Sequence, residues 1–362
     1  MTDDVLQRRT GGPLGHLEVV SERPERFVHA TPTIEDVGRH AGVSRQTVSN
    51  VLNAPHRVRP ETIERVQLAI NTLGYRANHH ARNLRTGTSR AIAYRIPPVV
   101  GHLNSVMDTF LHELTEAVEA IGCHILLFAS NDLDGEIARY WELSAQSAAD
   151  GVVFSSTERE DRRPAPLLER RMPFVSFGRT WGAAEHSWVD VDGRAGTRLA
   201  IHHLLANGHR RFAWLGPREP GVVNDEREQG VRSAIAAAGI PTADLHIVSL
   251  QDDAVVDRQA IANLLDGPDA PTAWVSMSDL QALTVLGELE SRGIVPGRDA
   301  AVIGFDDSPV AAYAGGGLTT IRQPITAVAQ TIAQLLSAQF ADPNSEPRGV
   351  LLEPELIVRR TG

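Results

Sequence analysis

Two patterns of hydrophobic and polar positions divide the chain. Between residues 32 and 73, apolar residues recur three and four positions apart, as on one face of short α-helices. From residue 91 onward, continuous apolar runs alternate with amphipathic stretches, which is typical of buried parallel strands joined by helices. The pattern therefore predicts a small all-α part followed by a doubly wound α/β part.

The first pattern predicts three short helices. A helical run over 34–41 is followed by Gly42, which tolerates the backbone angles of a sharp corner. A second helix opens at Ser44, because serine is a favoured N-cap residue. A third helix over 60–73 starts at a proline and repeats apolar residues at intervals of three and four. Together these helices enclose a small core, with a tight turn between the first two.

The polar face of the second helix carries the first candidate chemistry. It presents Arg45, Gln46, Ser49 and Asn50. Arginine forms paired hydrogen bonds with guanine, glutamine and asparagine do so with adenine, and serine hydroxyls reach phosphates. This face would then read the major groove of DNA. On these four residues alone, a solvated helix surface is an equal alternative.

The second pattern predicts two α/β lobes. Amphipathic helices such as 105–121 separate eight candidate strands, which are more than one sheet usually holds. Two sheets, one in each lobe, are the more natural arrangement. The candidate strands are 91–96, 124–129, 151–156, 174–178, 211–216, 245–250, 272–277 and 300–305.

Polar residues at the carboxyl ends of these strands are candidate ligand contacts, because ligands of parallel sheets bind there. Ser278 and Asp279 follow one run, Asp306 and Asp307 follow another, and Arg227 opens the helix after a third. Carboxylates accept and guanidinium groups donate hydrogen bonds to sugar hydroxyls. Each residue could instead be a helix N-cap or half of an ion pair, and for Asp307 that second interpretation is favoured.

Composition narrows the class of protein. The net charge is −10, yet residues 31–90 hold nine arginines against four acidic residues, as a part that neutralises phosphates requires. All 35 basic residues are arginine, which excludes lysine-dependent phosphate loops and Schiff-base chemistry. The single cysteine, Cys123, excludes an intramolecular disulfide and a cysteine-built metal cluster. We expect no cofactor and no metal.

Two further expectations concern location and the N-terminus. No apolar stretch is long enough to span a membrane and no signal sequence is evident, so we expect a cytoplasmic protein without a membrane partner. Residues 1–30 mix charges with glycine and proline and show no sustained period. They are predicted to be a disordered extension.

The segment AGVSRQTVSNVLN over 41–53, with the preceding TIEDV and the later GYRANHHARNLRTGTS, resembles the DNA-binding headpiece of the lactose/galactose repressor (LacI/GalR) family. The resemblance implies a helix-turn-helix domain over 31–78 and a hinge helix or linker over 79–90. Two positions depart from the family pattern: Gly38 stands where alanine is usual, and Asn50 where arginine is frequent.

The resemblance also implies which headpiece residues contact DNA. Base reading would fall to Arg45, Gln46 and Asn50. In the hinge, a leucine would wedge between central base pairs of the minor groove. The positions near the DNA backbone would be Thr33, Ser44, Thr47, Ser49, Arg82 and Arg85, and those in the minor groove Ala81 and Leu84.

The remainder of the chain, 91–362, resembles the effector-binding and dimerisation core of the same family, which is similar to type I periplasmic sugar-binding proteins. The stretches that carry this resemblance include VDVDGRAGTRLAIHHLLANGHRRFAWLGP and LTTIRQP. It implies a first lobe of about 91–190 with 323–341, a second of about 191–321 with 342–362, and three crossings between them.

By the same resemblance Arg227, Asp279 and Asp306 match effector-contacting positions. Ser278 replaces a usual asparagine, and Arg179 follows a glycine where many relatives have aspartate. This FGR sequence is similar to that of repressors that answer to glucosides or other oligosaccharides. Two aromatic residues, Trp181 and Phe110, could stack on a sugar ring, although each could equally be a core or rim residue.

The function implied is that of a transcriptional regulator, expected to be a repressor. It would bind a palindromic operator as a homodimer, with an affinity that a sugar-like effector changes. Two alternatives are a solute-binding protein for transport and a sugar-processing hydrolase. The basic headpiece opposes the first, and the lack of a nucleophile elbow, metal cluster or phosphate loop opposes the second. No heptad run follows the last strand, so a terminal coiled coil is not expected.

Overall fold

The computed structural model describes residues 32–75, 88–96, 105–182, 185–218, 221–250 and 254–362. The chain divides into two compact units, Met1–Arg82 and Asn83–Gly362. The expected hinge residues Ala81, Arg82, Leu84 and Arg85 lie outside the described residues, as does the N-terminal extension. Each unit is considered separately.

The first unit is the predicted three-helix headpiece. It contains α1 (Ile34–Ala41), α2 (Arg45–Asn53) and α3 (Pro60–Leu73), with a short 3-10 turn, η1, at Pro55–Arg57. Gly42 adopts φ 65° between α1 and α2, which is the left-handed region that favours glycine. The core of the headpiece consists of Val37, Val48, Val51, Val66 and Ala69.

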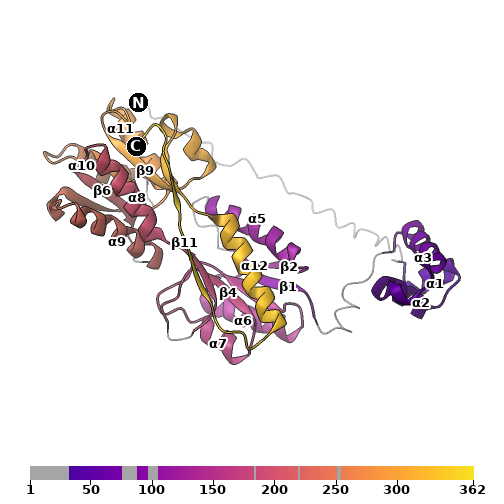
Figure 1. The fold of residues 1–362 in the computed structure, drawn as a ribbon. Helices are drawn as coiled ribbons and strands as arrows, with labels where there is room; N and C mark the ends of the chain where they lie inside the picture. Colours follow the sequence, from indigo (N-terminus) through magenta and orange to yellow (C-terminus); the bar gives the residue numbers. More distant parts are fainter. Residues whose placement is uncertain (1–31, 76–87, 97–104, 183–184, 219–220, 251–253) are drawn as a thin grey trace, which may run out of the picture. The chain divides into compact units, whose positions relative to one another are not determined.

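The second unit contains two six-stranded sheets. In Figure 1, labelled strands of the first sheet include β1, β2, β4 and β11, and those of the second include β6 and β9. The first has the order β11-β5-β4-β3-β1-β2 and is parallel throughout. Its strands are β1 (Ala91–Ile96), β2 (His124–Ala129), β3 (Gly151–Phe154), β4 (Phe174–Phe177), β5 (Trp188–Val191) and β11 (Gly349–Leu352).

Helices cover both faces of this first sheet. One face packs against α5 (Ser105–Ala120) and α12 (Ile325–Ala341), and the other against α6 (Leu133–Ala145) and α7 (Pro164–Glu169). The apolar face predicted for 105–121 is the one that packs: Val106, Phe110, Leu114 and Val118 are buried. The first lobe is thus a three-layer α/β/α sandwich.

The second sheet has the order β12-β10-β9-β8-β6-β7, in which β12 alone is antiparallel. Helices α8 (Gly193–Ala206) and α9 (Val222–Ala237) cover one face, and α10 (Ala254–Leu265) and α11 (Asp279–Ser291) the other. The strands are β6 (Phe212–Pro217), β7 (Leu245–Leu250), β8 (Ala273–Ser276), β9 (Ala301–Asp306), β10 (Thr319–Arg322) and β12 (Glu355–Ile357).

Short 3-10 turns complete the second unit. They are η2 (Thr242–Asp244), η3 (Pro309–Ala312) and η4 (Ala314–Gly316). The doubly wound α/β fold with two lobes is confirmed. All eight candidate strands form, although the third ends at Phe154 rather than at residue 156.

One expected boundary is wrong. The family resemblance predicts residues 342–362 in the second lobe, but β11 pairs with β5 in the first sheet, and only β12 joins the second. After α12 the chain first runs back along the open edge of β5, where it satisfies that strand's hydrogen bonds. The three crossings therefore follow β5, β10 and β11.

Candidate functional sites

The start of α2 is fixed by its own sequence. Ser44 is the N-cap, and its hydroxyl accepts a hydrogen bond from the backbone N–H of Thr47 at 3.1 Å. The two hydroxyl oxygens are 2.9 Å apart. Ser44 and Thr47 thus lie together at the N-terminus of α2, where backbone N–H groups favour an anion.

The exposed face of α2 brings the predicted base-reading residues together. Gln46 donates from Nε2 to Oδ1 of Asn50 at 3.1 Å. Arg45 is exposed, and its Nη1 lies 3.3 Å from Oε1 of Glu35. Such an exposed pair contributes little stability, so the guanidinium can leave Glu35 for another partner. Ser49 is half-buried on the same helix.

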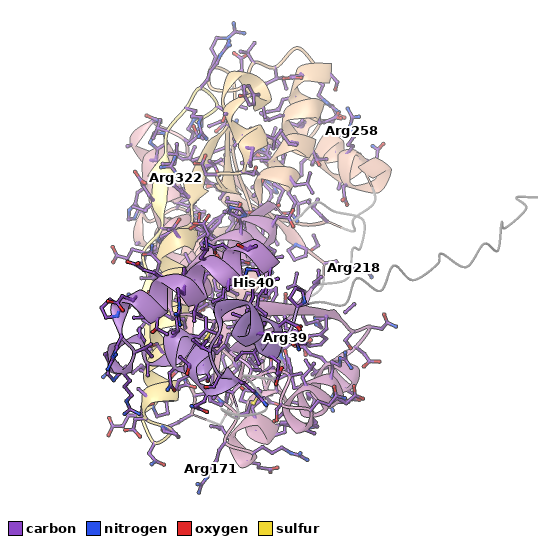
Figure 2. All side chains as sticks on the ribbon, turned by 90° about the vertical axis from the view of Figure 1, so that its right-hand side faces the viewer. Arg39, His40, Arg171, Arg218, Arg258 and Arg322 are labelled. Carbon is purple, nitrogen blue, oxygen red and sulfur yellow. The ribbon has the colours of Figure 1, made fainter. Side chains whose placement is uncertain are left out.

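Thr33 has a structural role in the headpiece. Its hydroxyl accepts from the Asp36 N–H at 3.3 Å, and its own backbone N–H donates to Oδ2 of Asp36 at 2.9 Å, which forms a capping box at the start of α1. Hydrogen bonds from Thr33 and the charge of Arg39 lower the pKa of Asp36. Arg39 and His40, in the last turn of α1, are exposed (Figure 2).

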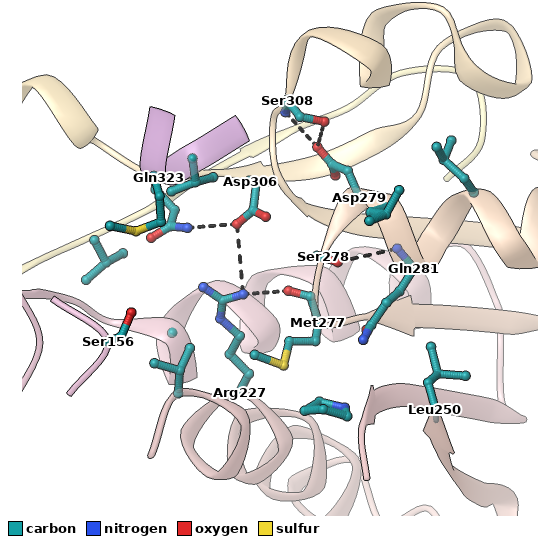
Figure 3. A pocket seen from close by; sticks show the side chains of 18 of the residues that line it. Ser156, Arg227, Leu250, Met277, Ser278, Asp279, Gln281, Asp306, Ser308 and Gln323 are labelled. Atoms are coloured by element: carbon teal, nitrogen blue, oxygen red, sulfur yellow. Dashed lines mark hydrogen bonds and ion pairs between the residues drawn. The ribbon is translucent and has the colours of Figure 1, made fainter. Parts of the chain in front are cut away.

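The second unit contains a cavity of about 1210 Å³ between its two lobes. Parallel sheets bind ligands beyond the carboxyl ends of their strands, and the cavity follows this rule. Its walls include residues at the ends of β3, β4 and β5 in the first lobe and of β8, β9 and β10 in the second. Figure 3 shows the polar centre of this cavity.

Arg227 is the central cation of the cavity. It lies in the first turns of α9, and its Nη1 donates to the backbone carbonyl of Met277 at 2.5 Å. The same nitrogen is 3.9 Å from Oδ1 of Asp306, and the guanidinium lies 3.5 Å from the ring centroid of Phe305. Its Nε is buried without a hydrogen-bond partner among the described residues. Burial lowers the pKa of Arg227, and Asp306 opposes this effect.

Asp306 faces Arg227 from the end of β9 (Figure 3). Gln323 donates from Nε2 to Oδ1 of Asp306 at 2.8 Å. Burial raises the pKa of Asp306 to about 7, although the charge of Arg227 lowers it, and Asp279 adds to the increase. Asp306 has φ 112°, an uncommon angle for a residue with a side chain. Because Gln323 bonds Asp306 and lines the cavity, it is part of the site, although the sequence pattern did not predict it.

The raised pKa of Asp306 predicts a specific pH dependence of stability. Between about pH 4 and 7 the native carboxyl keeps a proton that the unfolded chain has released. The free energy of unfolding should therefore fall as pH rises through this window, by up to ~1.4 kcal/mol per pH unit, and level off above it. Urea unfolding from pH 4.5 to 8 checks this, with Asp306→Asn as the control, because asparagine does not titrate. Parallel curves for the two proteins would contradict the prediction.

Asp279 and Ser278 lie in the cavity wall, but their side chains form hydrogen bonds with other residues of the protein. Oδ2 of Asp279 accepts from Ser308 N–H at 2.6 Å and from its hydroxyl at 2.8 Å, and Oδ1 accepts from the Thr320 hydroxyl at 2.5 Å. The Ser278 hydroxyl caps α11 by accepting from the N–H of Gln281 at 3.3 Å. These bonds fix the loops after β8 and β9, so direct ligand contact by either residue stays a prediction.

Two other expectations change in the structure. Phe110 is fully buried in the first lobe, packed against Tyr94 and Phe177, so the expected stacking of its ring on a ligand is wrong. Arg179 does not line the cavity; instead it pairs with Asp190 and Glu226, which do. Of the two interpretations given for Phe110, the structure supports that of a core residue.

The favoured interpretation of Asp307 is confirmed. Its carboxylate accepts from Arg322 at 2.8 Å and from Arg359 at 2.6 Å. Hydrogen bonds from these two arginines lower its pKa although burial raises it. In the parts of the chain that the structure describes, no group of three or more His, Cys, Asp or Glu residues could hold a metal ion, and no helix is long and apolar enough to cross a membrane.

Comparisons with known proteins agree with both units. The family model of the bacterial regulatory proteins of the lacI family matches residues 33–78, and that of the periplasmic binding protein-like domain matches residues 201–361. The HTH-type transcriptional regulator CelR of Thermobifida fusca is 35% identical over 342 residues, which cover 91% of this chain and 98% of the relative.

Solved structures give the same result. A transcriptional regulator CelR–cellobiose complex matches with a TM-score of 0.67 and 31% identity, over 91% of this chain and 100% of that chain. The Lac repressor dimer bound to operator and the anti-inducer ONPF matches with a TM-score of 0.79, over 91% of this chain and 98% of that chain; at 23% identity it supports the fold alone. The chain therefore belongs to the LacI family of bacterial regulatory proteins, and it is a DNA-binding transcriptional regulator rather than an enzyme.

Proposed function

We propose that this regulator is a repressor, that it binds a palindromic operator as a homodimer, and that a neutral saccharide in the interlobe cavity changes its affinity for DNA. The observation that carries the proposal is the donor and acceptor set at the cavity centre. Arg227 donates, Asp306 accepts, and Gln323 can do both. Such a set suits a ligand covered with hydroxyl groups.

The charge of the cavity favours a neutral ligand. Among the described residues that line it, five have a carboxyl group and two have a guanidinium group, Arg227 and Arg258. Even with Asp306 protonated, as its pKa of about 7 allows, four acidic side chains would face two cations. A sugar phosphate or a uronate would meet excess negative charge, whereas a neutral sugar would not. The carboxylates are Asp190, Glu226, Asp257, Asp279 and Asp306. The similarity to the solved CelR–cellobiose complex supports a saccharide of one or two rings.

The coupling to DNA follows from the position of the cavity. Its walls come from both lobes, so a ligand that contacts both walls favours one relative position of the lobes. If operator binding favours another position, the ligand changes operator affinity, typically by 1 to 3 kcal/mol of coupling free energy. We propose that the protein acts in the cytoplasm, where operator DNA is found.

Homodimer formation has a candidate surface on the second lobe. Tyr313, which directly follows η3, is 83% exposed. Exposed aromatic side chains are enriched in protein interfaces. A charged residue at Tyr313 should therefore shift the protein toward monomers in sedimentation measurements.

DNA selection from a random pool tests the proposed function. We expect the purified protein to enrich a palindrome, and cellobiose or another sugar of a mono- and disaccharide panel to change that enrichment. Titration calorimetry with glucose 6-phosphate serves as the anionic control and should give no binding. Enrichment without any response to the panel would refute the saccharide part alone, and no enrichment would refute operator binding.

Base reading by α2 gives a second prediction. Arg45→Ala should relax the preference at one position of each half-site and lower operator affinity by about 1–3 kcal/mol. Arg39→Ala, on the exposed end of α1, is the matched control and should affect all DNA sequences alike. Competition binding with operators substituted at single positions distinguishes the two outcomes. An unchanged base preference in Arg45→Ala would contradict the assignment.

A further inference from the structure

A second polar cluster lies in the cavity wall beside Arg227. Arg179, in the loop after β4, donates from Nε to Oδ2 of Asp190 at 2.8 Å. Its Nη2 donates to Oε2 of Glu226. Asp190 belongs to β5 of the first lobe and Glu226 to α9 of the second, so one guanidinium joins carboxylates from both lobes.

The two carboxylates, and not the arginine, face the cavity. Asp190 and Glu226 both line it, whereas Arg179 does not. The guanidinium of Arg179 lies 5.0 Å from the ring centroid of Trp181 and 5.7 Å from that of Trp188. These aromatic faces and the two ion pairs hold Arg179 in place behind the carboxylates.

Each carboxylate keeps hydrogen-bonding capacity toward the cavity. A carboxylate accepts about four hydrogen bonds. Asp190 accepts from Arg179 and, at Oδ1, from the N–H of Val191 at 2.8 Å. Both side chains are largely buried, with 14% of Asp190 and 11% of Glu226 exposed. A ligand hydroxyl that donates to either carboxylate would bond a charged acceptor, which is among the stronger hydrogen bonds.

We propose that Asp190 and Glu226 form a saccharide-hydroxyl subsite split between the two lobes, and that Arg179 is its positioning residue. The inference rests on the proposed function and deepens it, because it assigns contacts that the Arg227–Asp306–Gln323 centre does not supply. Neighbouring hydroxyls of one sugar ring bond Asp190 and Glu226 together, so the ligand itself links the lobes. Arg179 acts through the carboxylates and does not touch the ligand.

The chain also provides a control that separates ligand contact from lobe closure. Arg159, in the loop after β3, pairs with Asp225 at 2.9 Å across the same two lobes. Asp225 directly precedes Glu226 on α9, yet neither Arg159 nor Asp225 lines the cavity. Arg159→Gln therefore removes a cross-lobe ion pair without changing the cavity wall.

The test is titration calorimetry of the full-length protein with cellobiose, followed by each monodeoxy analogue of cellobiose. The variants are Asp190→Asn, Glu226→Gln, Arg179→Gln and the control Arg159→Gln. We expect the first two to weaken cellobiose binding at least tenfold, Arg179→Gln to weaken it severalfold, and Arg159→Gln to stay within twofold. Wild type should reject one or two particular analogues, and Glu226→Gln and Arg179→Gln should lose that discrimination.

Each outcome has a separate meaning. Wild-type affinity and wild-type discrimination in Asp190→Asn and Glu226→Gln would overturn the subsite. Equal weakening by Arg159→Gln and Arg179→Gln, with discrimination intact, would also overturn it, because the ion pairs would then act through lobe closure alone. If the wild type bound no saccharide of the panel, the proposed function would fail, and this inference with it. A melting temperature close to that of wild type shows which variants are folded.

Discussion

Replacing Arg227 with methionine is expected to abolish the response to saccharide while leaving operator binding in place. Methionine can occupy the space over the Phe305 ring, where the guanidinium now lies at 3.5 Å. It cannot donate to Met277 O or balance the charge of Asp306. Loss of a charged donor in a buried site should weaken saccharide binding about 100-fold or more, about 3 kcal/mol.

Two measurements on Arg227→Met check this result. Calorimetry with the saccharide found in the panel gives the affinity, and operator binding with and without that saccharide gives the response. Arg232→Met is the matched control: it lies on the same helix, pairs with Glu228 at 2.7 Å and does not line the cavity. Operator binding should persist in both variants, because the headpiece is a separate compact unit. Saccharide affinity within threefold of wild type in Arg227→Met would contradict the assignment.

Replacing Gly230 with alanine is expected to destabilise the second lobe and disturb the cavity together. A Cβ at this position would lie 2.1 Å from Oγ1 of Thr197 and 2.4 Å from the backbone oxygen of Arg194, both on α8. Helices α8 and α9 therefore approach closely only because residue 230 is glycine. The Thr197 hydroxyl donates to the backbone oxygen of Arg227 at 2.7 Å, so a shift of α9 moves Arg227 as well.

The expected cost of Gly230→Ala is about 2–3 kcal/mol in the free energy of unfolding, which is typical of overpacking in a well-packed core. Saccharide affinity should fall with it, because Arg227 is displaced. Gly221→Ala is the control: it lies at the N-cap of the same helix with open space around its Cβ, and should cost less than about 1 kcal/mol. Urea unfolding and calorimetry measure both effects. Equal stability of the two variants would show that α9 has room to shift.

Local sequence was sufficient for the headpiece. The N-cap Ser44 and the corner glycine Gly42 act on backbone groups within a few positions of themselves, and α1 ends and α2 begins where these residues predict. The capping role of Thr33 was not predicted, although it too depends on local sequence. The eight apolar strands were predictable for a related reason, since strands buried on both faces need continuous apolar runs.

The strands that the predictions missed are less apolar or lie at sheet edges. Only half of the residues of β5 are buried, and those of β11 and β12 are all exposed or half-buried. Such strands lack a continuous apolar run, so their pairing depends on which sheet edge the folded chain leaves open. For that reason the return of β11 to the first sheet did not follow from its sequence.

The cavity residues, too, were predictable from the sequence only in part. Polar residues after the strands, such as Arg227 and Asp306, were predictable from the rule that parallel sheets bind ligands at their carboxyl ends. The sequence did not predict which of these residues are free to contact a ligand. Both carboxylate oxygens of Asp279 accept hydrogen bonds from Ser308 and Thr320, and Phe110 is buried in the core.

By itself, the sequence determined the family, the helix-turn-helix and the two-lobed α/β class, because these depend on local capping, hydrophobic period and recognisable segments. Only the tertiary structure decided that Gln323 reaches Asp306 and that Arg179 holds Asp190 and Glu226 together. The physical reason is that these contacts join residues from different strands and helices. Their distances and pKa shifts exist only once the two lobes are folded and packed.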